Sequence, residues 1–292
     1  MLFLQLLVNG LTAGALYALM AVGFAMIYNG TRILHLAHGA VFTFASYVFY
    51  LLAVPAKLPV AIAAIGSILL TAALGMAMEL AVYKPLRQRN ASVSAILVAS
   101  IGLLTLFEAI FALVFTTDTK NMHEGSLATY SIGELTVTTL HLMIAAVAIV
   151  LFPILQLFLV RSKYGRAIRA LADNPRLALV LGIDTDRLYL IIFALGSALA
   201  AVAAALLSYD LGVRPQMGFS IMFVALVAVI VGGIGYLPGA AAGGMILGLL
   251  QQLSLFHLSA RWQEVVVFAV LIAFLIFRPQ GLYGGRLVTR RA

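Results

Sequence analysis

The chain has 292 residues, of which 64% are hydrophobic and 10% are charged, and its formal net charge is +8 at pH 7. A soluble domain has about 45–50% apolar and about 25% charged residues, so this composition excludes a chain built around one water-soluble core. The Lys and Arg residues lie in short gaps between long apolar runs, which favours membrane orientation over nucleic-acid binding as the reason for the charge. The sequence has no cysteine, which excludes disulfides, thiolate metal sites and cysteine nucleophiles.

Nine apolar segments approach the length of about 20 residues that a helix needs to cross a bilayer. They cover residues 4–29, 38–54, 59–82, 93–115, 137–160, 188–208, 218–234, 239–256 and 263–277. The seventh and eighth are short and rich in glycine, and only Gly235-Tyr236-Leu237-Pro238 separates them, so one of them could be re-entrant. We predict an all-α fold, a polytopic transmembrane helix bundle of eight or nine spans that forms one domain over residues 1–292.

The basic residues predict the orientation of these spans, because positive charge is enriched in cytoplasmic gaps. With nine spans and the N-terminus outside, four of the 18 Lys and Arg residues fall in outside gaps, namely Lys57, Lys120, Arg214 and Arg261. The others fall in inside gaps: Arg32; Lys84, Arg87 and Arg89; six residues between 161 and 187; and Arg278, Arg286, Arg290 and Arg291. We therefore expect the N-terminus outside and the C-terminus in the cytoplasm.

The basic gap at residues 161–187 has the pattern of a folded element. It contains Arg161, Lys163, Arg166, Arg169, Arg176 and Arg187. Asp173-Asn174-Pro175 predicts the end of one helix and the capped start of another, because a residue before proline disfavours the α conformation and Asn caps helices well. Gly182 predicts the end of the second helix. We expect a cytoplasmic helix-turn-helix that docks in a groove of a cytosolic partner; an amphipathic segment lying on anionic lipid is the alternative.

Four stretches of the sequence resemble the permeases of the branched-chain amino acid ABC transporter family, in that family's order. They are Asn9-Gly10-Leu11 with Tyr17-Ala18-Leu19 and Leu36-Ala37-His38-Gly39; the Gly-x-x-x-Arg-Ala…Asn…Ala…Gly-Ile pattern of the basic gap; Gly232-Gly233-Ile234-Gly235-Tyr236-Leu237-Pro238-Gly239; and Arg278-Pro279-Gln280-Gly281-Leu282-Tyr283-Gly284. The length is similar to the shorter of the family's two permease types. The resemblance implies an importer subunit of the bacterial inner membrane, forming part of the path for branched-chain or other small amino acids.

The resemblance also implies partners: a second permease that is usually a different chain, two cytosolic ATPases and a periplasmic substrate-binding protein. The sequence has no Gly-x-x-x-x-Gly-Lys-Ser/Thr motif, so we expect ATP to be used by the partner subunits and no cofactor to be bound by this chain. No His-Glu-x-x-His pair or serine–base arrangement lies in the spans, so we do not expect an enzyme.

Two sets of site residues follow. The resemblance assigns ATPase coupling to Gly165, Arg166, Arg169, Ala170, Asn174, Ala178, Gly182 and Ile183. Polar or small residues of the spans, Asn9, Tyr17, His38, Gly39 and Glu108, are candidates for the substrate path. An intramembrane carboxylate such as Glu108 is a functional candidate that could contact a substrate ammonium group, whereas lone polar residues in bundles more often bond a neighbouring helix.

The glycine-rich region leaves two interpretations open. Gly235, Gly239 and Gly243 are spaced four apart around Pro238, a pattern typical of close helix packing. The alternative is a broken helix whose backbone lines a pathway. We expect no metal site, since His35 and His38 have no carboxylate or third ligand near them in the sequence.

Three departures from the family pattern weaken the substrate assignment: His35 replaces the usual Asn, Ala45-Ser46 replaces Gly-Ala, and Tyr236 replaces a small polar residue. The resemblance also leaves urea, short amides and small aromatic acids as alternative substrates, because permeases similar to this family serve them. A secondary transporter or channel is the alternative of another class, although the sequence shows no convincing internal repeat of the kind typical of secondary carriers.

Overall fold

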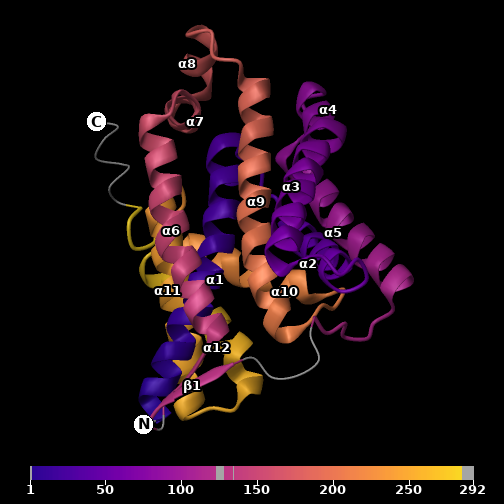
Figure 1. The fold of residues 1–292 in the computed structure, drawn as a ribbon. Coiled ribbons are helices and arrows are strands. Elements are labelled where there is room, and N and C mark those ends of the chain that lie inside the picture. The colour runs from indigo at the N-terminus through magenta and orange to yellow at the C-terminus, as the bar shows by residue number, and fades with distance from the viewer. Residues whose placement is uncertain (1, 123–127, 134, 285–292) are drawn as a thin grey trace. The chain divides into compact units, whose positions relative to one another are not determined.

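The computed structural model describes residues 2–122, 128–133 and 135–284, and these are mostly helical (Figure 1). The long helices are α1 (Leu2–Thr31), α2 (His38–Ala53), α3 (Val60–Met78), α5 (Val93–Phe115), α6 (Thr139–Arg161), α9 (Thr185–Leu211), α10 (Met217–Gly232), α11 (Leu237–Leu253) and α12 (Gln263–Phe277). Shorter pieces are the π-helix η1 (Glu79–Tyr83), α4 (Lys84–Gln88), α7 (Lys163–Asp173), α8 (Pro175–Val180), and the 3-10 turns η2 (Ser254–Phe256) and η3 (Ala260–Trp262). Each of the nine predicted apolar segments corresponds to one of the long helices.

Among the described residues, seven helical segments are long and apolar enough to cross a membrane, and α2 and α10 are shorter, with 16 residues each. From the sequence, segments 218–234 and 239–256 are the two least certain to span the membrane. In the structure the second of these is long enough to do so, whereas α2 is too short. Non-helical backbone precedes both short helices, and His35 and Ala37 before α2, and Val213 before α10, are buried in it. The predicted positions of the two termini concern residue 1 and residues 285–292, including Arg286, Arg290 and Arg291, which lie outside the described residues.

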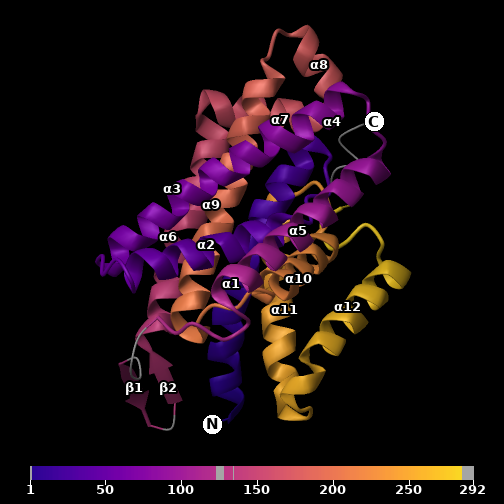
Figure 2. The ribbon, with the colours of Figure 1, turned by 90° about the vertical axis from the view of Figure 1, so that its right-hand side faces the viewer.

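The structure adds a β-hairpin that the all-α prediction did not include. Strands β1 (Thr129–Ile132) and β2 (Leu135–Thr138) pair antiparallel, with Thr129 opposite Thr138. The side chain of Gln5 in α1 extends this sheet: its Nε2 donates to the Thr136 carbonyl at 3.0 Å, and its Oε1 accepts from the Thr136 N–H at 2.9 Å. The hairpin therefore lies beside the N-terminal end of α1 (Figure 2). Four-residue strands without a long alternating pattern give little sequence signal.

The chain divides into two compact units, each assembled from segments that are distant in the sequence. Unit 1 comprises Met1–Ala25, Glu124–Val150 and Phe223–Ala292, and unit 2 comprises Met26–His123 and Leu151–Met222. The assignment of residues 1–292 to one permease domain stays a prediction.

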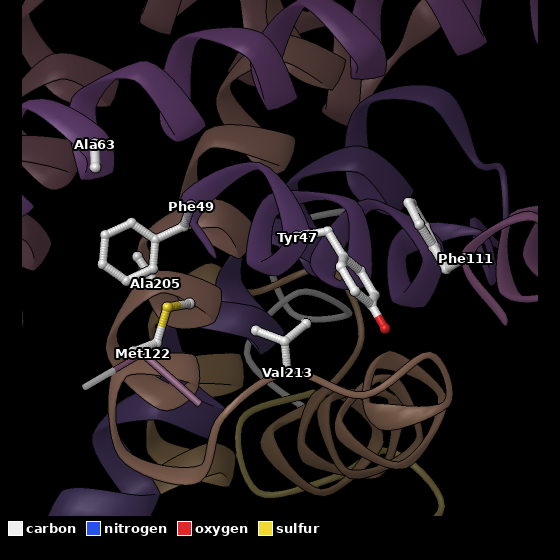
Figure 3. Packing of buried hydrophobic residues seen from close by; sticks show 7 residues of the cluster. All are labelled: Tyr47, Phe49, Ala63, Phe111, Met122, Ala205 and Val213. Atoms are coloured by element: carbon white, nitrogen blue, oxygen red, sulfur yellow. The ribbon is translucent and has the colours of Figure 1, made fainter. Parts of the chain in front are cut away.

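Unit 2 is built around α9, which packs against α2 and α3. Its apolar cluster contains Tyr47, Phe49, Ala63, Phe111, Met122, Ala205 and Val213 (Figure 3). The Tyr47 ring stacks on Phe111 and Phe115 with centroid distances of 4.9 and 4.4 Å. The Ser67 hydroxyl donates to the Ala45 carbonyl at 2.7 Å and joins α3 to α2.

Unit 1 contains a close crossing of α1 and α11 that depends on glycine. A Cβ at Gly14 would lie 2.9 Å from the Cα of Met245, and a Cβ at Gly10 would lie 3.0 Å from the Cα of Leu249. On the other helix, Gly244 and Gly248 face the α1 backbone just as closely. Small residues four apart on both helices allow this approach, which is a common way for transmembrane helices to associate.

Candidate functional site

The predicted helix-turn-helix begins at a capped and crowded corner. The Ser162 hydroxyl caps α7 by accepting the Gly165 N–H at 2.8 Å. A Cβ at Gly165 would overlap the Phe158 carbonyl oxygen and the backbone of Leu159 at the end of α6. Only glycine therefore allows α7 to turn so closely off α6, and Ile168 is buried on the same face of α7 as Gly165.

The turn and second helix follow the sequence prediction closely. The Asn174 Oδ1 caps α8 by accepting the Leu177 N–H at 3.0 Å, with Pro175 as the first helical residue. At the other end Gly182 has a φ of +74°. Its N–H donates to the Leu179 carbonyl at 3.0 Å, and the Ile183 N–H donates to the Ala178 carbonyl at 3.1 Å. These two bonds form a Schellman motif.

Two predicted coupling residues have contacts within the chain. The Arg166 guanidinium donates to the Arg161 carbonyl at 2.8 Å, and that of Arg169 donates to the Val160 carbonyl at 3.4 Å. Both therefore cap the C-terminal end of α6, where helix carbonyls lack intrahelical partners and favour positive charge. Ala170 is half-buried and Ala178 is buried.

The exposed residues of α8 and of its C-cap, which we name the α8 surface, are apolar apart from one arginine. They are Arg176, Leu177, Leu179, Val180 and Leu181. The apolar members are between 53% and 82% exposed, with Val180 the most exposed. Within the part of the chain that the structure describes, Arg176 forms no ion pair or hydrogen bond. Large apolar residues gathered on an exposed short helix indicate an interaction surface.

Arg32 is a site residue that the sequence reasoning missed. It follows α1 in a left-handed conformation with a φ of +59°. Its guanidinium donates to the Ala172 carbonyl in the last turn of α7 at 2.9 Å. This bond ties the C-terminal end of α1 to α7. The available signal was a lone basic residue directly after the first span.

A second charged group lies where α9 begins. The Lys84 Nζ is 2.8 Å from an Asp186 carboxylate oxygen, and the Arg87 guanidinium is 2.5 Å from Glu79 and 3.8 Å from Asp186. The Arg87 guanidinium also lies 4.0 Å above the centre of the Tyr189 ring. This cluster joins η1 and α4 to the first turn of α9, which directly follows the helix-turn-helix.

The substrate-path candidates of unit 1 bond to their neighbours. Asn9 accepts a hydrogen bond from Gln5 Nε2 at 3.0 Å, one turn earlier in α1. The Tyr17 hydroxyl donates to Gln251 Oε1 in α11 at 2.7 Å. These contacts are those expected of polar residues that join helices, and a path role for either residue stays a prediction.

The path candidates of unit 2 occupy two places. His38 and Gly39 are buried at the start of α2, where a Cβ at Gly39 would lie 2.8 Å from the Gly218 carbonyl oxygen at the start of α10. Glu108 shares the inward face of α5 with Leu104 and Phe111. Its Oε1 is buried and has no hydrogen-bond partner among the described residues.

A buried polar chain lies next to His38 and was also missed. The His35 Nδ1 is 2.7 Å from the Tyr83 hydroxyl, which donates to Ser100 Oγ at 3.0 Å. The same Ser100 oxygen accepts the Ala37 N–H at 2.9 Å. The last of these bonds satisfies a backbone donor of the non-helical segment before α2, as buried irregular backbone requires. No group of three potential metal ligands occurs among the described residues.

The glycine-rich region is tightly packed in unit 1. A Cβ at Gly239 would lie 2.5 Å from the Gly232 carbonyl oxygen, and one at Gly243 would overlap the Ala228 carbonyl oxygen. Gly235 has a φ of +98°, and Pro238 lies in the first turn of α11. The break is thus the connection between α10 and α11.

The C-terminal stretch packs against this connection. The Leu282 N–H donates to the Val231 carbonyl at 2.8 Å, and the Tyr283 N–H donates to the Gly232 carbonyl at 3.3 Å. These donors satisfy the last carbonyls of α10, which have no partner within the helix. A Cβ at Gly281 would lie 2.6 Å from Gly233. Two stretches of the family resemblance, far apart in sequence, therefore form one structural feature.

The chain matches a known protein family and several of its members. The family model described as "Branched-chain amino acid transport system / permease component" matches residues 6–275. The chain is 34% identical to the "High-affinity branched-chain amino acid transport system permease protein LivH" of Salmonella typhimurium, covering 97% of this chain and 96% of that protein. It is also 34% identical, with the same coverage, to the corresponding protein BraD of Pseudomonas aeruginosa.

A solved structure, PsaBC from Streptococcus pneumoniae in complex with Fab, has a TM-score of 0.52 and 15% identity over 97% of this chain and 95% of that chain. At this identity the likeness concerns the fold alone. The long apolar helices and the matching relatives define a multi-pass membrane protein of the permease class. The chain belongs to the branched-chain amino acid transport system permease component family, a family of transport proteins and not of enzymes.

Proposed function

We propose that the chain is a membrane-spanning permease subunit of an ABC importer, forming part of the path for branched-chain or other small amino acids. The observation that carries the proposal is identity of 34% over 97% of the chain to permeases named for branched-chain amino acid transport. The substrate is transferred from the names of these relatives. Separate cytosolic ATPase subunits supply the energy, and a second permease and a periplasmic binding protein complete the importer.

The proposed ATPase contact is the helix-turn-helix with its α8 surface. The surface combines exposed leucines and a valine with Arg176, which has no ion-pair partner among the described residues, so a groove with apolar walls and an acidic rim would complement it. The fixed corners at Gly165 and Gly182 hold α7 and α8 in one shape before docking, which lowers the entropic cost of binding. Arg166 and Arg169 contribute by holding α7 on the end of α6.

The proposed topology has nine crossings in the bacterial inner membrane, with the N-terminus outside and the C-terminus in the cytoplasm. In this topology α2 and α10 complete their crossings with the largely buried non-helical segments that precede them. The hydrogen bonds of the Ala37 N–H to Ser100 and of the Thr43 hydroxyl to the Pro215 carbonyl support irregular backbone at membrane depth. A reporter fused after residue 292 should be active only if it is a type that works in the cytoplasm, and activity of a periplasm-dependent reporter there would contradict the nine-span topology.

Uptake of radiolabelled leucine by cells that express the chain with its neighbouring transport genes tests the function. We expect uptake to need the ATPase and binding-protein genes, to resist a protonophore while cellular ATP is maintained, and to be inhibited by excess isoleucine and valine. Inhibition by urea, acetamide or phenylacetate instead would transfer the assignment to those substrates. Uptake by this chain alone, driven by an ion gradient, would show a secondary transporter.

A further inference from the structure

The cluster at the start of α9 links the proposed docking segment to the interior of unit 2. We name Glu79, Lys84, Arg87, Asp186 and Tyr189 the α4–α9 clamp. On one side, α9 begins at Thr185, directly after the Schellman motif that ends α8. The Asp184 side chain caps α9 by accepting the Arg187 N–H at 3.0 Å. Residues 181–183 are thus bonded back to α8 and Asp184 forward to α9, so the connection is short and largely fixed, and we expect displacement of α8 to move the first turn of α9.

On its other side the clamp holds a helix of unusual geometry. Glu79 and Tyr83 are the ends of the π-helix η1, which interrupts the run from α3 to α4. Single π-helical turns inside longer helices occur often at functional sites. Tyr83 in turn bonds His35, and the His35 ring packs on Phe193 of α9 with centroids 5.1 Å apart. The path of contacts therefore runs from α8 through α9, the clamp and η1 to the segment that leads into α2.

The clamp is only partly satisfied, which indicates a role other than stability. Glu79 is 1% exposed, yet its Oε2 has no hydrogen-bond partner among the described residues, and neither has Nη1 of Arg87. A buried ion pair is weak evidence of stabilisation, because the cost of desolvating both charges offsets much of their attraction. Asp186 is half-exposed and faces both Lys84 and Arg87. The geometry gives Arg87 donor capacity for a second arrangement when α9 moves.

We propose that Arg87 and its clamp partners are positioning residues that transmit movement of the docked helix-turn-helix to η1 and the start of α2. This inference rests on the proposed ATPase contact. Arg87 would exchange contact between Glu79, which is fixed in η1, and Asp186 and Tyr189, which move with α9. The clamp acts on coupling, meaning the substrate moved for each ATP hydrolysed, and not on ATPase docking.

The test uses the complete importer, reconstituted with its ATPases and binding protein, and measures three quantities on each variant. They are co-elution of the ATPases with a tagged permease, ATP hydrolysis, and uptake of radiolabelled leucine. The double variant Glu79→Gln/Arg87→Met removes both charges of the ion pair, so that neither is left unpaired. The variant Asp186→Asn alters the half-exposed side and leaves the Glu79–Arg87 pair in place. Exposed residues with no contact in the clamp and outside the helix-turn-helix, Arg89→Gln and Asp118→Asn, are the matched controls.

We expect both clamp variants to retain the ATPases and to hydrolyse ATP, with uptake per ATP reduced roughly twofold to thirtyfold, the range found for mutations in coupling networks. The controls should keep the wild-type ratio. A wild-type ratio in Asp186→Asn, or in the double variant wherever it assembles, would overturn the proposal and leave the clamp a structural ion pair. Loss of ATPase co-elution in Asp186→Asn would also overturn it, by placing the cluster in docking. Failure of the docking proposal itself is seen separately, in variants of the α8 surface.

Discussion

Replacing Val180 with lysine distinguishes an α8 surface that docks in a groove of the ATPase from one that lies on anionic lipid. Val180 is 82% exposed, so docking in a protein groove can bury most of a side chain whose full burial contributes about 1.5–3 kcal/mol. Loss of that contact should cost about 1–2.5 kcal/mol, roughly a 5- to 70-fold weaker affinity for the ATPase. Val180 lies in the last turn of α8, where a cation favours the helix, so the helix itself should persist. On anionic lipid the same lysine would instead add about 1 kcal/mol of attraction.

The assay is retention of the ATPase subunits by a tagged permease during purification, titrated over ATPase concentration to give an apparent affinity. Gln88→Lys adds the same charge at the end of α4, another exposed position, and should retain the ATPase normally. Attraction of the added lysine to anionic lipid in the nanodiscs that hold the permease pair cannot explain a difference between the two variants, because both carry the same added charge. Unchanged ATPase affinity in Val180→Lys would refute the assignment of docking to the α8 surface.

The helix-turn-helix was predictable because its signals are local. Asn174, Pro175 and Gly182 each act on hydrogen bonds within a few residues, and the structure has the cap, the helix start and the Schellman motif at these positions. The long helices were predictable for a similar reason, since length and hydrophobicity identify them without tertiary information. The shortness of α2 was not, because the non-helical backbone before it is satisfied from a distant part of the chain, where Ser100 accepts the Ala37 N–H and is itself bonded by Tyr83.

The roles of the basic residues were the least predictable part of the site. A sequence shows that Arg166 and Arg169 share a face, but not that both point back to the end of α6. Arg32 and Arg87 look like ordinary orientation signals, and only tertiary contacts reveal their partners Ala172 and Glu79. Charge counts thus predict which side of the membrane a basic residue faces. Its hydrogen-bond or ion-pair partner depends instead on which carbonyl or carboxylate the tertiary packing brings close to it.

Three further predictions test the packing and the polar residues of the spans. Gly248→Ala should lower the thermal midpoint of the purified permease, because its Cβ would overlap the backbone of Gly14 and overpacking costs about 1–3 kcal/mol; Gly102→Ala, with open space around it, should not. Tyr17→Phe removes the bond to Gln251 and should cost about 1 kcal/mol of stability with transport preserved, so loss of uptake without loss of assembly would instead indicate a path role for Tyr17. Glu108→Gln should preserve both assembly and leucine uptake within a few-fold. Glu108 is half-buried on the face of α5 that also carries Phe111, and its buried Oε1 has no hydrogen-bond partner among the described residues. The glutamine amide has nearly the same size as the carboxyl group and carries no charge to desolvate, so it should pack in this apolar environment as well as the acid does. If the carboxylate met a substrate ammonium group, the neutral amide would lose that attraction, and uptake would fall steeply in a normally assembled importer.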